Sequence, residues 1–245
     1  MLEVRGLTKS FGALRACDGI DFDVREGETH AVIGPNGAGK TTFISQLAGN
    51  LLPDAGRVRF AGEDITRLPA PKRARRGLGR SFQITSVYPE FSALDNVALA
   101  VQARSGHSFR FWRPARGDPR LAEPAERVLE QVGLRERKNV LAANLAHGEQ
   151  RQLEVAMALA TEPRLLLLDE PMAGMGTEES QRMIALLSRL KQSKTIILVE
   201  HDMDAVFRLA DRISVLVYGR VIATDVPEKI RANEEVRKAF LGEEV

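Results

Sequence analysis

Short apolar runs along the chain predict two kinds of strand. Residues 2–9 and 20–24 alternate between apolar and polar positions, which indicates half-buried antiparallel strands. Residues 29–33, 165–168 and 195–199 are largely apolar and of strand length, and the last two runs are rich in Leu, Ile and Val, as buried parallel strands are. We therefore expect an antiparallel pair near the start of the chain and a buried parallel sheet.

A helical pattern follows each of the three buried runs, near 40–48, 178–190 and 202–209. This alternation of strand and helix predicts an α/β sheet wrapped by helices. Further on, residues 218–220 (Tyr-Gly-Arg) are typical of a tight turn between two strands. The tail at 227–245 is rich in charge and predicts a helix that is solvated on the protein surface.

The stretch from about 95 to 160 differs from the rest, because its pattern predicts helices and loops and no convincing strand. Within it, Asp118 and Pro119 are suited to be the cap and first residue of a helix, and Gly133 is suited to end it. Five apolar residues share one face of that helix: Leu121, Ala125, Val128, Leu129 and Val132. The prediction is a single domain over 1–245, with an α/β core at 1–94 and 161–245 and an inserted helical subdomain at about 95–160.

Composition narrows the class of protein and its location. The formal net charge is only +2, which is too weak a bias to indicate nucleic-acid binding. Cys17 is the one cysteine, so an internal disulfide is impossible and a reducing compartment is expected. The first residues show no signal peptide, and no run approaches the roughly 18 apolar residues of a membrane helix. Any membrane role is therefore expected to depend on a partner.

A phosphate-binding loop is the first chemical motif. Residues 34–41 read Gly-Pro-Asn-Gly-Ala-Gly-Lys-Thr and fit G-x-x-x-x-G-K-[ST] between a predicted strand and a predicted helix. The glycines let backbone N–H groups point at phosphate oxygens, and the helix start adds partial positive charge. Lys40 can reach the β- and γ-phosphates, and the Thr41 hydroxyl can bind Mg²⁺.

Polar residues also follow the other two buried strands. Asp169 and Glu170 come directly after 165–168, and carboxylates at the C-terminal edge of an α/β sheet lie where such sheets bind ligands. Asp169 is expected to hold Mg²⁺ through water, and Glu170 to orient or deprotonate the attacking water. Glu200 and His201 end the third strand, where His201 could hydrogen-bond the γ-phosphate. The sequence thus predicts a nucleoside-triphosphate hydrolase.

Further motifs resemble those of ABC ATPases over nearly the whole chain. Residues 145–150 (Leu-Ala-His-Gly-Glu-Gln) are similar to the family signature Leu-Ser-Gly-Gly-Gln, and 173–176 stand where the family has its D-loop. Gln83 is similar to the Q-loop glutamine, Phe11 to the aromatic that stacks on adenine, and His201 to the switch histidine. The fold that this resemblance implies is a P-loop NTPase core of ABC type, with an antiparallel β subdomain and the helical subdomain carrying the signature.

The resemblance implies a mechanism that needs two subunits. Two ATPase subunits meet head to tail and bury two ATP molecules, each with Mg²⁺, between the phosphate loop of one subunit and the signature of the other. The implied catalytic residues are Lys40, Gln83, Glu170 and His201, and the implied metal ligands are Thr41, Gln83 and Asp169. The implied nucleotide contacts are Phe11, Gly34, Pro35, Asn36, Gly37, Ala38, Gly39, Lys40, Thr41 and Thr42, with Leu145, Ala146, His147, Gly148 and Glu149 acting on the partner's nucleotide.

The chain also departs from the family pattern. Ala146 replaces the signature serine, and the lost hydroxyl removes a hydrogen bond to phosphate worth roughly 1.5–3 kcal/mol. His147 replaces a glycine, and one hypothesis is that its ring supplies a substitute donor. Residues 173–176 lack the usual Ser and Asp, which leaves the cross-dimer contacts of this segment open. Phe11 keeps the stacking surface of the more frequent Tyr, with strand-end core packing as its alternative role.

A narrower resemblance is to the longer ATPase of bacterial and archaeal branched-chain amino-acid importers. It rests on 145–154, 199–203 and 236–243, and on a loop with Phe109, Phe111 and Trp112 among arginines. It implies a subunit on the cytoplasmic face of the membrane, held by two transmembrane permease subunits and served indirectly by an external binding protein. The active pair could be a homodimer or a heterodimer.

Three alternatives stay open at this stage. The first is a urea or amide importer ATPase of the same subgroup. The second is a soluble ABC ATPase of DNA repair or translation, although the coiled-coil insertion or tandem unit typical of those proteins is missing. The third is a clamp that binds ATP and hardly hydrolyses it, because Ala146 weakens the signature.

Overall fold

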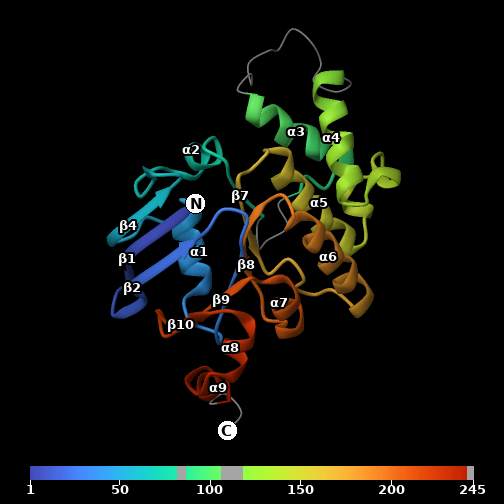
Figure 1. Ribbon diagram of the computed structural model, residues 1–245. Coiled ribbons are helices and arrows are strands. Elements are labelled where there is room, and N and C mark those ends of the chain that lie inside the picture. The colour runs from blue at the N-terminus through green and yellow to red at the C-terminus, as the bar shows by residue number, and fades with distance from the viewer. Residues whose placement is uncertain (82–86, 106–117, 242–245) are drawn as a thin grey trace.

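The computed structural model describes residues 1–81, 87–105 and 118–241. Two sheets organise the chain (Figure 1). The first is antiparallel, with strand order β2-β1-β4-β5. Its strands are β1 (Leu2–Phe11), β2 (Leu14–Val24), β4 (Ala55–Phe60) and β5 (Glu63–Asp64). The expected antiparallel pair is present, and both of its strands are longer than the alternation indicated.

The second sheet carries the buried parallel strands in the order β10-β9-β3-β8-β7-β6. Strands β3 and β8 have the bounds expected from their apolar runs, and β7 extends one residue further, to Asp169. Only β10 runs antiparallel to its neighbour. The strands are β3 (Thr29–Ile33), β6 (Leu78–Arg80), β7 (Leu165–Asp169), β8 (Thr195–Val199), β9 (Arg212–Val217) and β10 (Arg220–Asp225).

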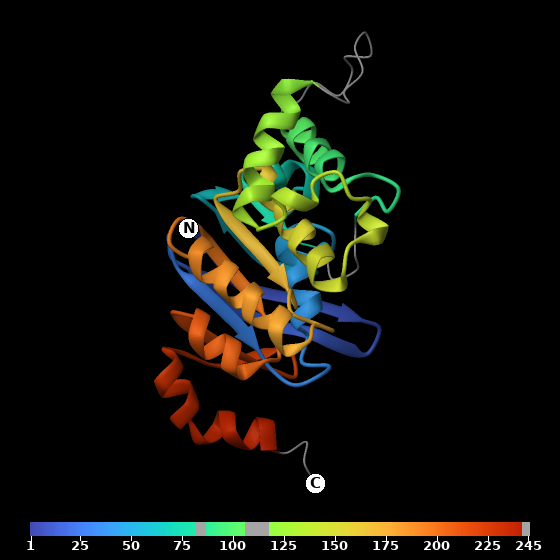
Figure 2. The same cartoon turned by 90° about the vertical axis from the view of Figure 1, so that its right-hand side faces the viewer.

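The parallel sheet is buried on both faces, which explains why its strands are apolar without alternation. On β7, Leu165 and Leu167 pack in a cluster with α1 (Lys40–Ala48) and the antiparallel sheet, whereas Leu166 and Leu168 pack on the opposite side with α6 (Thr177–Leu190). Helix α7 (Met203–Leu209) lies beside α6 on that second face (Figure 2). The strand ends are therefore the places where polar groups of this sheet can meet a ligand.

The described part of 95–160 contains helices and no strand beyond a single bridge between Ser92 and Leu141. Its helices are α3 (Ala93–Ser105), α4 (Pro119–Gln131) and α5 (His147–Ala160), with short 3₁₀ turns at Arg135–Arg137 and Ala142–Asn144. The Asp118 carboxylate accepts a hydrogen bond from the Arg120 N–H, Pro119 is the first helical residue, and Gly133 follows the helix with φ of +82°, as the capping argument predicted. None of the helices that the structure describes is long and apolar enough to cross a membrane.

The tail differs from the prediction of one solvated helix. It forms two helices, α8 (Pro227–Ala232) and α9 (Glu234–Leu241), because Asn233 leaves the helical conformation and its side chain caps the second helix. Ile230 and Val236 are buried against β3, β9 and α7, so the tail covers part of the sheet. The sequence reading also missed β4, β5, β6 and the short helix α2 (Ala70–Ala74).

Candidate functional site

The phosphate loop joins β3 to α1 and is enclosed by backbone from distant parts of the chain. Gly34 has φ of +154°, and a Cβ placed on it would lie 2.0 Å from the carbonyl oxygen of Leu216. Gly39 has φ of +101°, and a Cβ there would lie 2.1 Å from the carbonyl oxygen of Ala16. Both positions therefore require glycine, for conformation and for space. The loop is held rigidly between β9 and β2.

Lys40 begins α1 and lies almost wholly buried over the loop. Its Nζ donates to the carbonyl oxygens of Gly34 at 2.5 Å and Pro35 at 3.0 Å. Helix α1 has neither a side-chain cap nor an acidic residue in its first turn. A helix start of this kind, with an ammonium group beside it and an exposed Thr41 following, is suited to an anion.

The strand ends bring the remaining predicted residues to the same edge. In the register of the parallel sheet, Val199 pairs with Asp169 on one side and with Val32 on the other. The phosphate loop, Asp169-Glu170 and Glu200-His201 therefore leave three neighbouring strands at one level. This convergence is the arrangement that the sequence predicted.

Asp169 presents a buried oxygen that protein groups leave unsatisfied. The carboxylate is 1% exposed; its Oδ2 lies 3.2 Å from a guanidinium nitrogen of Arg80, and its Oδ1 has no hydrogen-bond partner among the described residues. Burial raises the pKa of the Asp169 carboxyl, and the nearby positive charges of Arg80 and Lys40 oppose that rise. A buried acceptor without a partner fits a metal-bound water. Arg80 was not recognised from the sequence, where it is one of many arginines.

Glu170 is held in an unusual backbone conformation beside His201. Its φ is +51°, a region that costs a non-glycine residue on the order of 1–3 kcal/mol and often marks functional sites. Its N–H donates to the carbonyl oxygen of Val199 at 2.9 Å, and its Oε1 lies 2.5 Å from Nε2 of His201. The carboxylate is half-buried and the imidazole exposed, so both groups can meet a ligand at the sheet edge.

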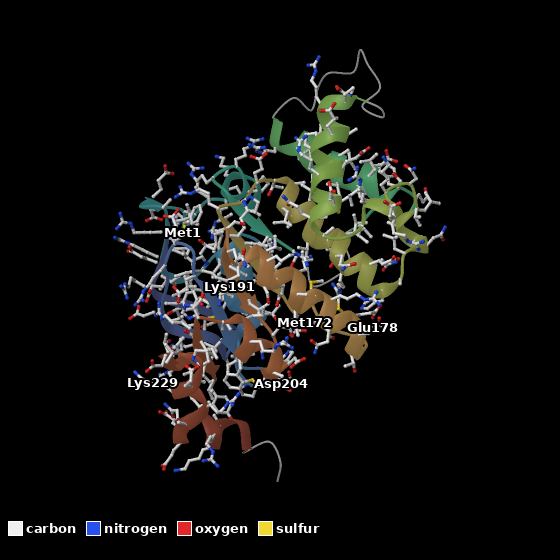
Figure 3. All side chains as sticks on the ribbon, turned by 45° about the vertical axis from the view of Figure 1, so that its right-hand side comes forward. Met1, Met172, Glu178, Lys191, Asp204 and Lys229 are labelled. Carbon is white, nitrogen blue, oxygen red and sulfur yellow. The ribbon has the colours of Figure 1, made fainter. Side chains whose placement is uncertain are left out.

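The signature residues contact the segment that follows Glu170. His147 donates from Nε2 to the carbonyl oxygen of Ala173 at 3.1 Å, so its ring turns toward the D-loop position of its own chain. The Gly148 N–H donates to the Glu179 carboxylate at 3.2 Å, and a Cβ on Gly148 would lie 2.7 Å from that oxygen. Figure 3 labels Glu178, in the first turn of α6, and Met172, in the segment that precedes this helix. Glu179 was missed because nothing in its sequence context indicates this contact.

At the start of α5, the Ala146 N–H donates to the Glu149 carboxylate at 2.9 Å, and Ala146 offers no side-chain oxygen. Glu149 therefore caps its own helix, and the adjacent Leu145 is buried. The structure thus groups the signature with 173–179, and groups the phosphate loop with Asp169, Glu170 and His201.

Phe11 ends β1 with half of its surface exposed. The centroid of its ring lies 5.7 Å from the Nζ of Lys9. In the antiparallel sheet Phe11 pairs across the turn with Leu14, which is also exposed. Core packing therefore does not account for this aromatic residue. Gln83 and the loop with Phe109, Phe111 and Trp112 lie outside the described residues.

Comparisons with known proteins agree with this geometry. A family model described as ABC transporter matches residues 17–173, and one described as branched-chain amino acid ATP-binding cassette transporter matches 220–245. The chain is 41% identical over 250 residues to the high-affinity branched-chain amino acid transport ATP-binding protein BraF of Pseudomonas aeruginosa, covering 99% of this chain and 98% of the relative. It is 35% identical over 248 residues to the probable branched-chain amino acid transport ATP-binding protein LivG of Archaeoglobus fulgidus, covering 99% and 95%.

Solved structures give the same result for the fold. An ATP-binding cassette of an ABC transporter in its ADP conformation superposes with a TM-score of 0.88 at 28% identity, covering 99% of this chain and 98% of that one. A nucleotide-free cassette from an ABC transporter superposes with a TM-score of 0.87 at 26% identity, covering 98% of both chains. The predicted fold class is confirmed by these likenesses.

Proposed function

This chain belongs to the ABC transporter ATP-binding family, and we propose that it hydrolyses ATP, with Mg²⁺, to drive a branched-chain amino-acid importer. The observation that carries the proposal is the meeting of Lys40, Asp169, Glu170 and His201 at one sheet edge beside a glycine-dependent loop. The relatives named for branched-chain amino acid transport support the substrate class.

The chain's own residues supply binding, orientation and proton transfer. Lys40 would turn from the carbonyls of Gly34 and Pro35 to phosphate oxygens, and the first turn of α1 would donate N–H groups. Glu170 would accept the proton of the attacking water, while His201 would donate to the γ-phosphate. Bound Mg²⁺ would neutralise charge developing on the phosphates, held by Thr41, by Asp169 through water, and by Gln83.

A second ATPase subunit would complete each site. His147 contacts the D-loop segment of its own chain and Gly148 contacts Glu179 on α6, and the signature of another subunit would close the phosphate loop. Gly148 would face the γ-phosphate of the nucleotide on the partner subunit. To bind that phosphate, its N–H would first release the Glu179 carboxylate, to which it donates in this structure. The sequence is compatible with a homodimer or with a pairing to a related ATPase.

The transmembrane subunits would dock on an apolar groove beside β6. The groove encloses about 350 Å³ between α2, β6, α3 and α5, and Gln83 follows β6 closely in the sequence. Most of its lining is apolar, including Ala74, Ala100 and Met157, and the charged residues Arg80 and Glu154 also line it. Docking there would place the chain at the cytoplasmic face of the membrane and couple the permeases to the nucleotide site, while the external binding protein supplies substrate on the far side.

The proposal is tested by purifying the tagged chain from its native membrane and identifying its partners by mass spectrometry. Recovery of a second ATPase and two membrane subunits is the expected result, and the neighbouring binding protein is then screened with branched-chain amino acids and with urea. Urea binding would move the assignment to the urea and amide importers. Recovery of ribosomes or DNA-repair proteins in their place would overturn the transport function.

Replacing Phe11 by alanine is expected to raise the Kd for ATP roughly 5- to 150-fold, because stacking on a base contributes about 1–3 kcal/mol. Phe11→Tyr should keep the wild-type affinity, since the ring surface is retained. Titration calorimetry with ATP measures the effect. Tripolyphosphate, which has no base, is the internal control: if its Kd rises as much as that of ATP, Phe11 does not act by stacking.

A further inference from the structure

Glu200 is a buried carboxylate between β8 and His201 that no motif of the site includes. It is 3% exposed, and burial raises the pKa of its carboxyl. Its Oε1 accepts the N–H of Met172 at 2.8 Å, and its Oε2 accepts the N–H of His201 at 3.1 Å. Buried carboxylates are stable only with such donors. Both oxygens of Glu200 are therefore committed to backbone groups on two different loops.

These contacts close a ring around the catalytic pair. From Glu170 the chain passes through Pro171 to Met172, whose N–H donates to the Glu200 carboxylate. His201 follows Glu200 in the chain, and its Nε2 lies within hydrogen-bond distance of the Glu170 carboxylate, which closes the ring. A hydrogen bond from the Glu170 N–H to the Val199 carbonyl crosses the ring. Pro171 adds rigidity because its φ is fixed. Within this ring Glu170 has φ of +51°, a conformation that persists only where the surrounding contacts determine it.

We propose that Glu200 is a positioning residue for ATP hydrolysis, which ties the loop entered at Met172 to His201 and so fixes the geometry of Glu170 and His201. The inference rests on the proposed roles of these two residues. Met172 also starts the segment whose Ala173 carbonyl is bound by His147 of the signature. Glu200 thus links the segment at the D-loop position to the catalytic pair.

The chemistry of the contact requires a carboxylate of this length. A glutamine has the same shape, but its NH₂ group would confront one of the two N–H donors, so one link of the ring is lost. An aspartate keeps the charge, but its side chain is one methylene shorter and cannot span from His201 to Met172. Misplacement of reacting groups by about 1 Å can cost 10²-fold in rate. We therefore expect either substitution to lower kcat about 10- to 100-fold.

The matched control is Glu28→Gln. Glu28 is likewise buried, at 7% exposure, and accepts a backbone N–H from Arg25 at 2.7 Å, but it lies before β3 at the opposite end of the sheet from the nucleotide site. ATPase kinetics and thermal unfolding are measured on the full chain, assembled with the partners on which its activity depends, for wild type, E28Q, E200Q and E200D. In E200Q and E200D the KM for ATP should stay near wild type while kcat falls, and E28Q should keep the wild-type kcat.

A double-mutant cycle with His201→Ala decides whether Glu200 acts through the pair. If it does, adding E200Q to H201A should lower kcat by less than a further threefold, because the geometry that Glu200 maintains is already lost in H201A. Multiplicative losses, an unchanged kcat in E200Q and E200D, or a fall in kcat that E28Q reproduces would overturn the inference. Should H201A and E170Q both leave turnover unchanged, the proposed roles of His201 and Glu170 fail. Failure of the proposed function is a separate outcome, seen as no ATP hydrolysis by the assembled wild-type protein.

Discussion

Replacing Glu170 by glutamine is expected to lower kcat for ATP hydrolysis by roughly 10²–10⁴-fold, the range typical of a lost general base. Glutamine has the shape of glutamate and can keep a hydrogen bond to His201, which lies 2.5 Å from the carboxylate. It cannot accept the proton of the attacking water. The KM for ATP should stay near its wild-type value, because the phosphates are bound by the loop and Lys40.

The same variant should accumulate the dimer expected from the proposed function, if hydrolysis is the step that reopens the pair, as the resemblance to ABC ATPases implies. Size-exclusion chromatography with and without ATP measures the shift from monomer to dimer, and release of phosphate measures turnover. Glu178→Gln serves as control, because Glu178 is an exposed glutamate paired with Arg182 on α6. A normal rate of hydrolysis in E170Q would show that Glu170 is not the base.

Replacing Lys40 by alanine is expected to raise the Kd for ATP by roughly 10²-fold or more. Each hydrogen bond from a charged group contributes about 1.5–3 kcal/mol, and the ammonium group would donate to both the β- and γ-phosphates. The substitution also removes a positive charge that opposes the raised pKa of Asp169, so Mg²⁺ binding at the proposed metal site should weaken as well.

Fluorescence titration with ATP and with ADP measures this loss. The loss should be larger for ATP, because ADP lacks the γ-phosphate that Lys40 reaches. Lys229→Ala, on α8 and paired with Asp225, should keep the wild-type affinity. Retained ATP binding and turnover in K40A would exclude the phosphate role of Lys40.

The sequence predicted the elements whose pattern depends on burial alone. The strands at 29–33 and 195–199 and the helix at 40–48 have the expected bounds, because two-sided burial and a glycine-rich loop are visible locally. The region 55–80 was missed. Its strands are short or alternate with arginines, as in β4 and in the three-residue β6, so their pattern is weak until a neighbouring strand pairs with them.

The candidate site divides in the same way. Lys40, Asp169, Glu170 and His201 could be named in advance, because their residue types and spacing carry the chemistry. Arg80 and Glu179 could not, and Glu200 was recognised only as a polar residue at a strand end, without a role. The importance of all three lies in contacts with residues far along the chain: Asp169, Gly148 and Met172. The pattern of apolar and polar residues along the chain does not indicate such long-range hydrogen bonds. The division of the predicted tail helix into two helices was likewise not visible in the sequence, since the break depends on the cap that Asn233 forms.

The position of β3 between β8 and β9 also has a consequence for the order in which the protein matures on the ribosome. The antiparallel pair β1-β2 joins neighbouring segments and can form as soon as both have emerged, because its contacts are local. The phosphate loop emerges soon afterwards, yet the strands on both sides of β3, and the Leu216 carbonyl that packs on Gly34, are synthesised only after the whole helical region at about 95–160. A nascent chain therefore gains its nucleotide site only after β9 has emerged from the ribosome.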